Sequence, residues 1–250
     1  MIGLIPAAGS GTRMYPFTRA NPKELFPIQR KAVIDHVVET MHKFGEAEKI
    51  FVVVGNHKGA IIDHLGNGSM LNESNLKIAY LFQEELKGLA HAIYQGKDWI
   101  NEDFIVHVGD AFIEPKSEIK KAVEIHKSCR PFATILAREV NDPTKYGILR
   151  IDSKGNIIET IEKPTWEEAE KFKTKNGKYL VNLGIYILTP KFFDYFEKTP
   201  LGKKNEYQVP DVFKNAISNG ETIKVSCIKG NYLDLGNWED AEKAWENSKK

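Results

Sequence analysis

One glycine-rich segment near the amino terminus has the residue types that bind anions. It runs Pro6-Ala7-Ala8-Gly9-Ser10-Gly11-Thr12-Arg13, directly after a predicted strand. Small residues let successive backbone N–H groups approach a phosphate closely, so such a segment can bind an anion without any side chain. Arg13 and Lys23 then follow on a stretch stiffened by prolines. Because cations in fixed positions suit a polyphosphate whose charge grows during a reaction, we expect a phosphate site here.

Two common phosphate-binding motifs do not fit this segment. The dinucleotide fingerprint needs a third glycine at position 14, where this chain has Met14. The P-loop needs Gly-Lys followed by Ser or Thr, and no Gly-Lys pair of this chain has that context. The plainer alternative is a tight turn beside ordinary surface cations. The arginine, the prolines and Lys23 favour the phosphate site.

Two aspartates are candidate ligands for a divalent cation. Asp110 follows the buried-strand pattern of residues 106–109, and Asp234 ends the strand-like segment 231–234. Mg²⁺ in nucleotide sites is held by one or two carboxylates together with phosphate oxygens and water. Either aspartate could instead cap a turn. The histidines show no i, i+4 pair of the kind found in helical metal sites, and we expect His91 and His107 to serve packing and hydrogen bonding.

Alternating strands and helices are predicted to position these residues. Short β-branched runs indicate strands, and apolar residues three and four apart indicate helices. In the first half of the chain, strands are predicted at 2–5, 50–54, 76–81 and 104–108, and helices at 33–44, 60–65, 90–99 and 119–126. This alternation is typical of a parallel sheet with crossover helices, which binds ligands at the carboxyl ends of its strands.

The second half of the chain has a different pattern. Strands are predicted at 132–137, 147–151, 157–161 and 180–188, with a last helix from about Trp238. Residues 153–156 supply the turn of a hairpin between two of these strands. The sequence therefore predicts an α/β fold with a mixed sheet. No repeat or linker divides the chain, so we expect one domain over residues 1–250.

Taken together, the motifs resemble the sugar-1-phosphate nucleotidyltransferases, also called nucleoside-diphosphate-sugar pyrophosphorylases. The resemblance rests on residues 9–13, Pro16, Thr18, Pro22-Lys23-Glu24 and Pro27-Ile28, and further blocks match in order as far as Trp238. Residues 5–9 and 22–24 are most similar to UTP:glucose-1-phosphate uridylyltransferases, followed by the relatives that use dTTP. The resemblance implies a Rossmann-like three-layer fold with a mixed, mainly parallel sheet. It also implies a nucleotide-binding part at about 1–131 and a β-rich sugar-binding part at about 132–250.

The resemblance also assigns a role to each matching residue. Gln83 and Gly88 would contact the nucleobase with the backbone near Ala8 and Gly9, and Glu206–Asp211 would be structural, with Asp211 in the first turn of a helix. One departure from the family pattern is Ala111, where many members carry Asp or Asn. The implied sets are Arg13, Lys23 and Lys163 as catalytic cations; Ala8, Gly9, Ser10, Gly11, Thr12, Gln83 and Gly88 for the nucleotide; Tyr146, Gly147, Glu162 and Asn182 for the sugar phosphate; and Asp110 and Asp234 for Mg²⁺.

The implied reaction is nucleotidyl transfer. An oxygen of a sugar 1-phosphate, by resemblance glucose 1-phosphate, would attack the α-phosphorus of UTP or dTTP in line, and pyrophosphate would leave. The attacking group is already anionic, so positioning and charge neutralisation would suffice without a general base. Two other classes stay open: a non-catalytic nucleotide-sugar-binding protein and a glycosyltransferase. The absence of an Asp-x-Asp segment argues against the glycosyltransferase.

Charge and composition exclude several other functions. The chain has 35 Lys and Arg against 34 Asp and Glu, a net charge of +1, which argues against nucleic-acid or membrane partners. No uncharged segment is longer than Tyr179–Pro190, which is shorter than the roughly 20 residues of a membrane-spanning helix. Two cysteines cannot form a disulfide framework. We therefore expect a cytoplasmic enzyme without a signal peptide, and association into homo-oligomers stays open.

Overall fold

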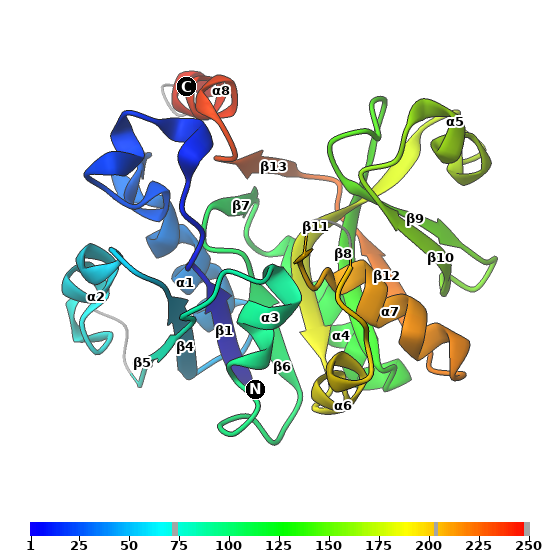
Figure 1. The fold of residues 1–250 in the computed structure, drawn as a ribbon, viewed down its shortest axis with the longest axis horizontal. Coiled ribbons are helices and arrows are strands. Elements are labelled where there is room, and N and C mark those ends of the chain that lie inside the picture. Colours follow the sequence, from blue (N-terminus) through cyan, green and yellow to red (C-terminus); the bar gives the residue numbers. More distant parts are fainter. Residues whose placement is uncertain (72–74, 203–204, 248–250) are drawn as a thin grey trace.

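A nine-stranded mixed sheet forms the centre of the computed structural model (Figure 1). The structure describes residues 1–71, 75–202 and 205–247. The strands of this sheet are β1 (Ile2–Pro6), β4 (Lys49–Val54), β5 (Lys77–Phe82), β6 (Phe104–His107), β8 (Ala133–Val140), β9 (Gly147–Ile151), β10 (Ile157–Glu162), β11 (Tyr179–Leu188) and β12 (Ile223–Cys227). Their order is β10-β9-β11-β6-β1-β4-β5, with β8 paired to both β11 and β12.

The first half of the chain builds the parallel part of the sheet. Strand β1 pairs in parallel with β4 and β6, and β4 pairs in parallel with β5. Leu4 and Ile5 of β1 are fully buried and belong to different hydrophobic clusters, because successive side chains of a strand point to opposite faces. Both faces of the sheet are therefore covered.

The second half adds antiparallel strands. Strand β11 pairs antiparallel with β6, β8 and β9, and β9 forms a hairpin with β10. At the tip of this hairpin Gly155 has a φ of +75°, a conformation that side chains with a Cβ rarely adopt. The hairpin places Gly147 opposite Glu162, two residues for which the sequence predicted a shared role.

Helices cover the two faces of the sheet in separate groups (Figure 1). Their bounds are α1 (Val33–Lys43), α2 (Gly59–Leu65), α3 (Leu89–Tyr94), α4 (Glu118–Cys129), α5 (Trp166–Ala169), α6 (Lys191–Glu197), α7 (Val209–Ser218) and α8 (Trp238–Asn247). Val37 of α1 and Ile119 of α4 pack in the cluster that contains Ile5. Ile93 of α3 and Val212 of α7 pack in the cluster that contains Leu4. The result is a three-layer arrangement.

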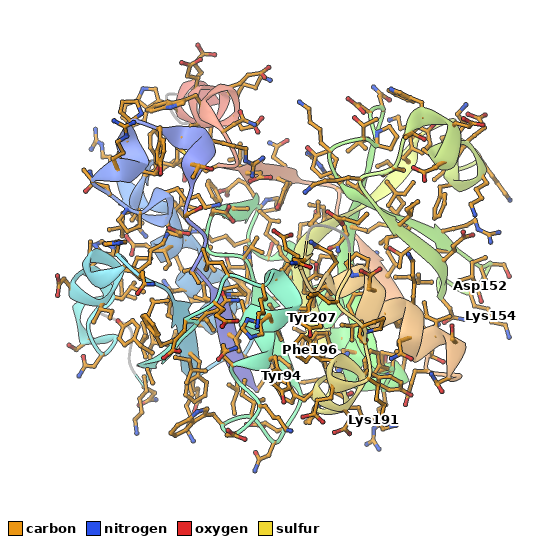
Figure 2. The ribbon with its side chains drawn as sticks, in the orientation of Figure 1. Tyr94, Asp152, Lys154, Lys191, Phe196 and Tyr207 are labelled. Atoms are coloured by element: carbon orange, nitrogen blue, oxygen red, sulfur yellow. The ribbon has the colours of Figure 1, made fainter. Side chains whose placement is uncertain are left out.

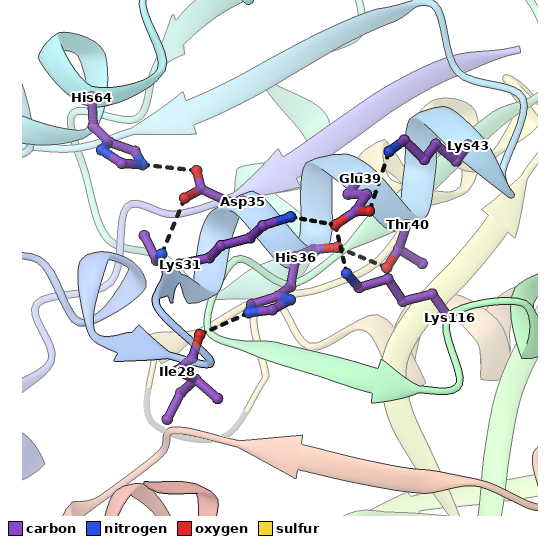
Figure 3. Close-up of polar contacts among 10 residues, drawn as sticks. Ile28, Lys31, Asp35, His36, Glu39, Thr40, Lys43, His64 and Lys116 are labelled. Atoms are coloured by element: carbon purple, nitrogen blue, oxygen red, sulfur yellow. Dashed lines mark hydrogen bonds and ion pairs between the residues drawn. The ribbon is translucent and has the colours of Figure 1, made fainter. Parts of the chain in front are cut away.

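Helix α1 is held to its surroundings by buried and partly buried polar contacts (Figure 3). His36 Nε2 lies 3.0 Å from the carbonyl oxygen of Ile28, and the His36 ring stacks on Phe112. Glu39 accepts hydrogen bonds from Lys116 at 2.6 Å and from Lys31 at 3.2 Å. Burial opposes the ionised form of Glu39, but these ammonium groups lower its pKa to about 2. These contacts hold the segments that contain Ile28, Lys31 and Lys116 against the helix.

A small third core joins the N-terminal loop to the end of the chain. Met14, Phe112, Leu235 and Ala241 are buried together in it. Strand β7 (Ala111–Glu114) pairs antiparallel with β13 (Asn231–Asp234) in a separate two-stranded sheet, and a second small sheet joins β2 (Pro27–Ile28) to β3 (Lys31–Ala32). Helix α8 lies against the loop at the top of Figure 1.

The predicted α/β fold class is confirmed, and the differences are local. The helix predicted at 90–99 ends at Tyr94 and continues as turns, in which Gly96 and Lys97 donate to the carbonyls of Ile93 and Tyr94. Strands β7 and β12 and helices α5 and α6 are not among the predicted elements. Short elements of this kind carry too few periodic positions to be recognised. In the described ranges, no helix combines the length and apolar character needed to cross a membrane.

Candidate active site

The glycine-rich loop is fixed to the sheet by its first residues. The Ala7 N–H donates to the carbonyl of Val53 at 2.8 Å, and the Gly109 N–H donates to the carbonyl of Pro6 at 3.1 Å. The loop therefore starts beside the end of β6. Gly11 has a φ of +66° and opens the short helical turn Thr12–Met14, while its carbonyl accepts a 2.7 Å hydrogen bond from the Thr18 hydroxyl. The loop conformation is thus set by hydrogen bonds of its backbone, one of them to the Thr18 side chain.

Two adjoining cavities lie at the carboxyl ends of the parallel strands β1, β5 and β6 and beside β9, β10 and β11. We call them the first cavity, of about 400 Å³, and the second cavity, of about 230 Å³. Predicted residues that line the first are Ala8, Gly9, Ser10, Arg13, Lys23, Gln83, Gly88, Asp110 and Lys163. Those that line the second are Arg13, Asp110, Tyr146, Gly147, Glu162, Lys163, Asn182 and Asp234. Of the predicted site residues, only Gly11 and Thr12 line neither cavity.

The two cavities share charged residues from both halves of the chain. Arg13, Asp110 and Lys163 line both. A molecule in the first cavity would therefore meet a molecule in the second beside these three side chains.

Lys23 and Asp110 form an ion pair at the floor of the first cavity. The Lys23 ammonium bonds directly to Asp110 Oδ2. Burial favours neutral Lys23, but Asp110, Glu24 and Asp234 together raise its pKa above the usual value. Burial likewise disfavours ionised Asp110, and the Lys23 charge lowers its pKa nonetheless. Both groups are therefore charged at neutral pH.

Asp234 is brought beside Asp110 by the small sheet. Residue Asp234 of β13 stands opposite Ala111 of β7, and the Leu235 N–H donates to the Asp110 carbonyl at 2.9 Å. Burial and the Asp110 charge raise the pKa of Asp234 to about 7, although Lys23 and Arg13 oppose this. A Cβ on Gly236 would stand 3.4 Å from Asp234 Oδ1 and 3.5 Å from Arg13 Nη2, so the guanidinium also lies close by.

The two aspartates fit a hard divalent cation. Besides burial, the Asp110 charge helps to raise the pKa of Asp234, so a cation shared by the two carboxylates would reduce their repulsion, and oxygen ligands suit Mg²⁺. Across residues 1–71, 75–202 and 205–247, no cluster of three or more acidic, histidine or cysteine side chains forms a metal site. A cation held here would therefore need phosphate oxygens or water as its remaining ligands, which is the usual situation of Mg²⁺ in nucleotide sites.

A buried ion pair next to Lys23 was missed by the sequence analysis. Lys58 Nζ lies 2.8 Å from Glu24 Oε2, and both side chains are almost fully buried. Burial raises the pKa of Glu24, while Lys58 and Lys23 lower it. The charges of Lys58, Glu24, Lys23 and Asp110 thus alternate in sign. The sequence offers no signal for this pair, because its members are 34 positions apart and Lys58 follows no recognisable motif.

Gln83 and Gly88 both line the first cavity. Gln83 is buried after β5, and its N–H donates to the carbonyl of Val54 at 2.8 Å. Gly88 has a φ of +96°, and a Cβ there would stand 2.7 Å from the carbonyl oxygen of Tyr207. Only glycine therefore fits at this position, where the chain before α3 passes under the segment that leads to α7.

The second cavity is lined by the β9–β10 hairpin and by β11. The Lys163 N–H donates to the Tyr146 carbonyl at 2.9 Å, and the Lys163 ammonium lies 3.6 Å from Glu162 Oε1. Burial raises the pKa of Glu162, with Lys163 opposing. Asn182 Oδ1 accepts from the Gly184 N–H at 2.8 Å, and its Nδ2 donates to the Tyr186 hydroxyl at 2.8 Å. Within the described residues no partner takes the second Nδ2 hydrogen of Asn182, which can therefore donate to a ligand.

Some lining residues were not predicted as site residues. Gln208 lines both cavities, Glu206 lines the first, and Gln208 Nε2 donates to Glu206 Oε2 at 2.6 Å. The family resemblance implies a structural role for this segment. Asp211 does lie in the first turn of α7, as predicted. Tyr232 lines the second cavity, and its hydroxyl donates to the Leu183 carbonyl at 2.8 Å.

A model of the nucleotidyl transferase family matches residues 2–250. The chain belongs to this family. Among curated relatives of this nucleotidyl transferase, the UTP–glucose-1-phosphate uridylyltransferase of Staphylococcus epidermidis is 34% identical over 262 residues, which covers 93% of this chain and 86% of that protein. The bifunctional protein GlmU of Methanococcus maripaludis is 30% identical over 240 residues. That match covers 96% of this chain but 52% of GlmU, so the chain spans about half the length of that relative.

Solved structures agree with the family assignment. A crystal structure of UDP-glucose pyrophosphorylase complexed with UDP-glucose matches this nucleotidyl transferase with a TM-score of 0.85 and 30% sequence identity. The match covers 99% of this chain and 98% of that one. The mixed α/β fold is therefore that of a nucleotidyltransferase over nearly the whole chain.

Proposed function

We propose that this protein transfers a uridylyl group from UTP to glucose 1-phosphate, giving UDP-glucose and pyrophosphate. The observation that carries the proposal is the junction of the two cavities at Arg13, Asp110 and Lys163. A triphosphate in the first cavity and a sugar phosphate in the second would meet there. The likeness to uridylyltransferases and to a UDP-glucose complex supports the choice of substrates. Residues about 1–131 would supply the nucleotide cavity and residues about 132–250 the sugar cavity, within one domain.

The reaction would depend on bringing two anions together. One phosphate oxygen of glucose 1-phosphate attacks the α-phosphorus, the bond between that phosphorus and the bridging oxygen breaks, and pyrophosphate carries the electron pair away. Lys163 binds the sugar phosphate, Lys23 the α-phosphate and Arg13 the departing β- and γ-phosphates. Backbone N–H groups of residues 8–12 bind the same triphosphate. Because every charge is placed before the substrates arrive, little reorganisation is needed during the reaction.

Asp110 and Asp234 would hold Mg²⁺. When bound, the ion neutralises phosphate charge and polarises the phosphoryl group. Asp110 is engaged with Lys23 in the structure. Lys23 is thereby placed beside the carboxylates that would hold the cation, where its ammonium would contact the α-phosphate.

Pyrophosphate release is the direct test. The protein is incubated with Mg²⁺ and each pairing of UTP, dTTP, CTP, ATP or GTP with glucose, galactose or N-acetylglucosamine 1-phosphate. We expect the highest kcat/KM for UTP with glucose 1-phosphate. A preference for dTTP would instead make the protein a thymidylyltransferase. Nucleotide-sugar binding without any pyrophosphate release would show a non-catalytic binding protein. Transfer of the sugar from UDP-glucose to an acceptor, with release of UDP, would show a glycosyltransferase.

A further inference from the structure

The amide of Gln83 is held by two neighbours inside the first cavity. Its Nε2 lies 2.9 Å from His91 Nδ1 and 3.4 Å from the carbonyl oxygen of Gly88. A carbonyl oxygen can only accept a hydrogen bond, so the amide nitrogen must face Gly88. The same nitrogen then faces His91, whose Nδ1 must therefore be the acceptor. His91 and Gly88 together fix which end of the amide points toward them.

His91 is itself held in place from several sides. It lies on α3, and the centroid of its ring is 6.3 Å from the ring centroid of Tyr207 and 6.3 Å from that of Phe196. Figure 2 shows Tyr207 and Phe196 next to this helix. Burial and the charge of Lys87 lower the pKa of His91, although a hydrogen bond with the Glu85 backbone opposes them. A neutral imidazole has one acceptor nitrogen, as the contact with Gln83 requires.

The fixed amide leaves Gln83 Oε1 as the atom that a ligand in the first cavity can use. In the described part of the chain, no hydrogen bond engages this oxygen. Uracil and thymine carry a hydrogen on N3 and can donate it to such an oxygen. Cytosine has a lone pair on N3, which would be repelled. Resting on the proposed function, we propose that His91 is a positioning residue that orients Gln83 to accept uracil or thymine and to reject cytosine.

Loss of the His91 acceptor would allow the side-chain amide of Gln83 to flip, so that its nitrogen and oxygen exchange places. Only the Gly88 contact would then hold its orientation, and at 3.4 Å that contact is weak. A reversed amide presents Nε2 to the base and can donate to N3 of cytosine. His91 gives specificity by holding the Gln83 oxygen against the lone pair of cytosine N3. Without His91 this repulsion is lost, and discrimination against cytosine is lost with it. The effect falls on the choice of base and leaves the phosphate contacts unchanged.

The experiment compares His91→Phe with wild type, using UTP and CTP. Phenylalanine keeps an aromatic ring beside Tyr207 but has no acceptor. We expect the UTP-to-CTP ratio of kcat/KM to fall about tenfold or more, the scale of one hydrogen bond to a buried group. His91→Asn, whose Oδ1 can take the place of Nδ1, should restore most of the ratio. The control is Tyr94→Phe on the same helix, because the Tyr94 hydroxyl bonds to Glu197 at 2.6 Å rather than to Gln83.

Calorimetric binding of UTP and CTP, measured without sugar phosphate, separates this inference from the proposed function. If the wild type binds UTP more tightly than CTP and His91→Phe loses the difference, the inference holds even where no turnover is seen. A folded His91→Phe variant with the wild-type ratio would overturn it. If His91→Phe does not fold, His91→Leu takes its place with the same expected result. An equal loss in His91→Asn would also count against the inference, because it would indicate a packing role.

Discussion

Lys23 and Lys163 are both cations of the proposed site, yet 14% of the Lys23 side chain is exposed against 60% of Lys163. Lys23 is paired with Asp110 and sits next to the buried Lys58–Glu24 pair. The nearest partner of Lys163 is Glu162 at 3.6 Å, on an antiparallel hairpin at the end of the sheet. The nucleotide side is thus preorganised by buried charges, whereas the sugar side presents its cation on an exposed segment. We infer that the first sets the rate and the second the affinity for the sugar phosphate.

A lysine-to-methionine substitution should lower the free energy of unfolding much more on the nucleotide side than on the sugar side. Lys58→Met would leave Glu24 buried without its partner, which costs about 3–5 kcal/mol of the free energy of unfolding. Lys163→Met removes an exposed charge and should change that free energy by less than about 0.5 kcal/mol. Urea unfolding of both variants checks this. Equal losses would show that the buried pair is not what distinguishes the two sides.

The pH dependence of the free energy of unfolding should also depend on a buried group, the imidazole of His107. Burial lowers the pKa of His107 on β6 to about 4, from an ordinary value near 6.5. The unfolded chain therefore binds a proton between these values that the folded chain does not, and stability falls as the pH drops from about 6.5 to 4. A shift of this size corresponds to about 3 kcal/mol. Urea unfolding from pH 7 to 4 should give a shallower decline for His107→Gln than for the wild type. An unchanged slope would mean that the buried imidazole is not the cause of the decline.

Activity should respond most strongly on the nucleotide side. Asp110→Asn should keep its fold and lower kcat by about 10²-fold or more, the scale of losing one preorganised electrostatic group. Lys23→Ala should lower kcat more than nucleotide affinity, because its contact strengthens as charge develops. Steady-state pyrophosphate release at saturating Mg²⁺ measures both. Nearly full turnover by Asp110→Asn would remove that residue from the metal site.

The smallest effect is expected on the sugar side. Lys163→Ala should raise the KM for glucose 1-phosphate by about tenfold, the scale of one charge-assisted hydrogen bond, with a smaller change in kcat. Lys171→Ala is a matched control, because Lys171 is as exposed but pairs with Glu159 away from the cavities. The same assay measures both variants. A collapse of kcat in Lys163→Ala at unchanged KM would assign the rate-setting role to both sides.

The sequence predicts the parallel half of the fold better than its connections. The strand at 50–54 and the helix at 33–44 agree with the structure to within one residue, because long apolar patterns report burial directly. Strand β7 did not appear because four residues directly after Asp110 carry no periodic signal. Yet β7 pairs with β13 to bring Asp234 beside Asp110. The closeness of these acids depends on pairing across more than a hundred residues.

The candidate site also contains residues that a local motif predicts and contacts that only the folded chain creates. Motifs such as residues 9–13 mark the loop, since anion binding restricts residue types along a short segment. Contacts that position the motif leave no local pattern. The Glu24–Lys58 pair and the His91–Gln83 contact join different elements, and only the folded chain shows them. His91 was expected to serve packing and hydrogen bonding, and its partner could not be read from spacing.

In the proposed reaction both substrates occupy adjoining cavities and react directly, without a covalent enzyme intermediate. The most direct test uses one diastereomer of UTP with sulfur on the α-phosphorus, glucose 1-phosphate and Mg²⁺, followed by assignment of the phosphorus configuration in the product. A single in-line displacement predicts inversion. Retention would mean two successive displacements through the enzyme and would contradict the account.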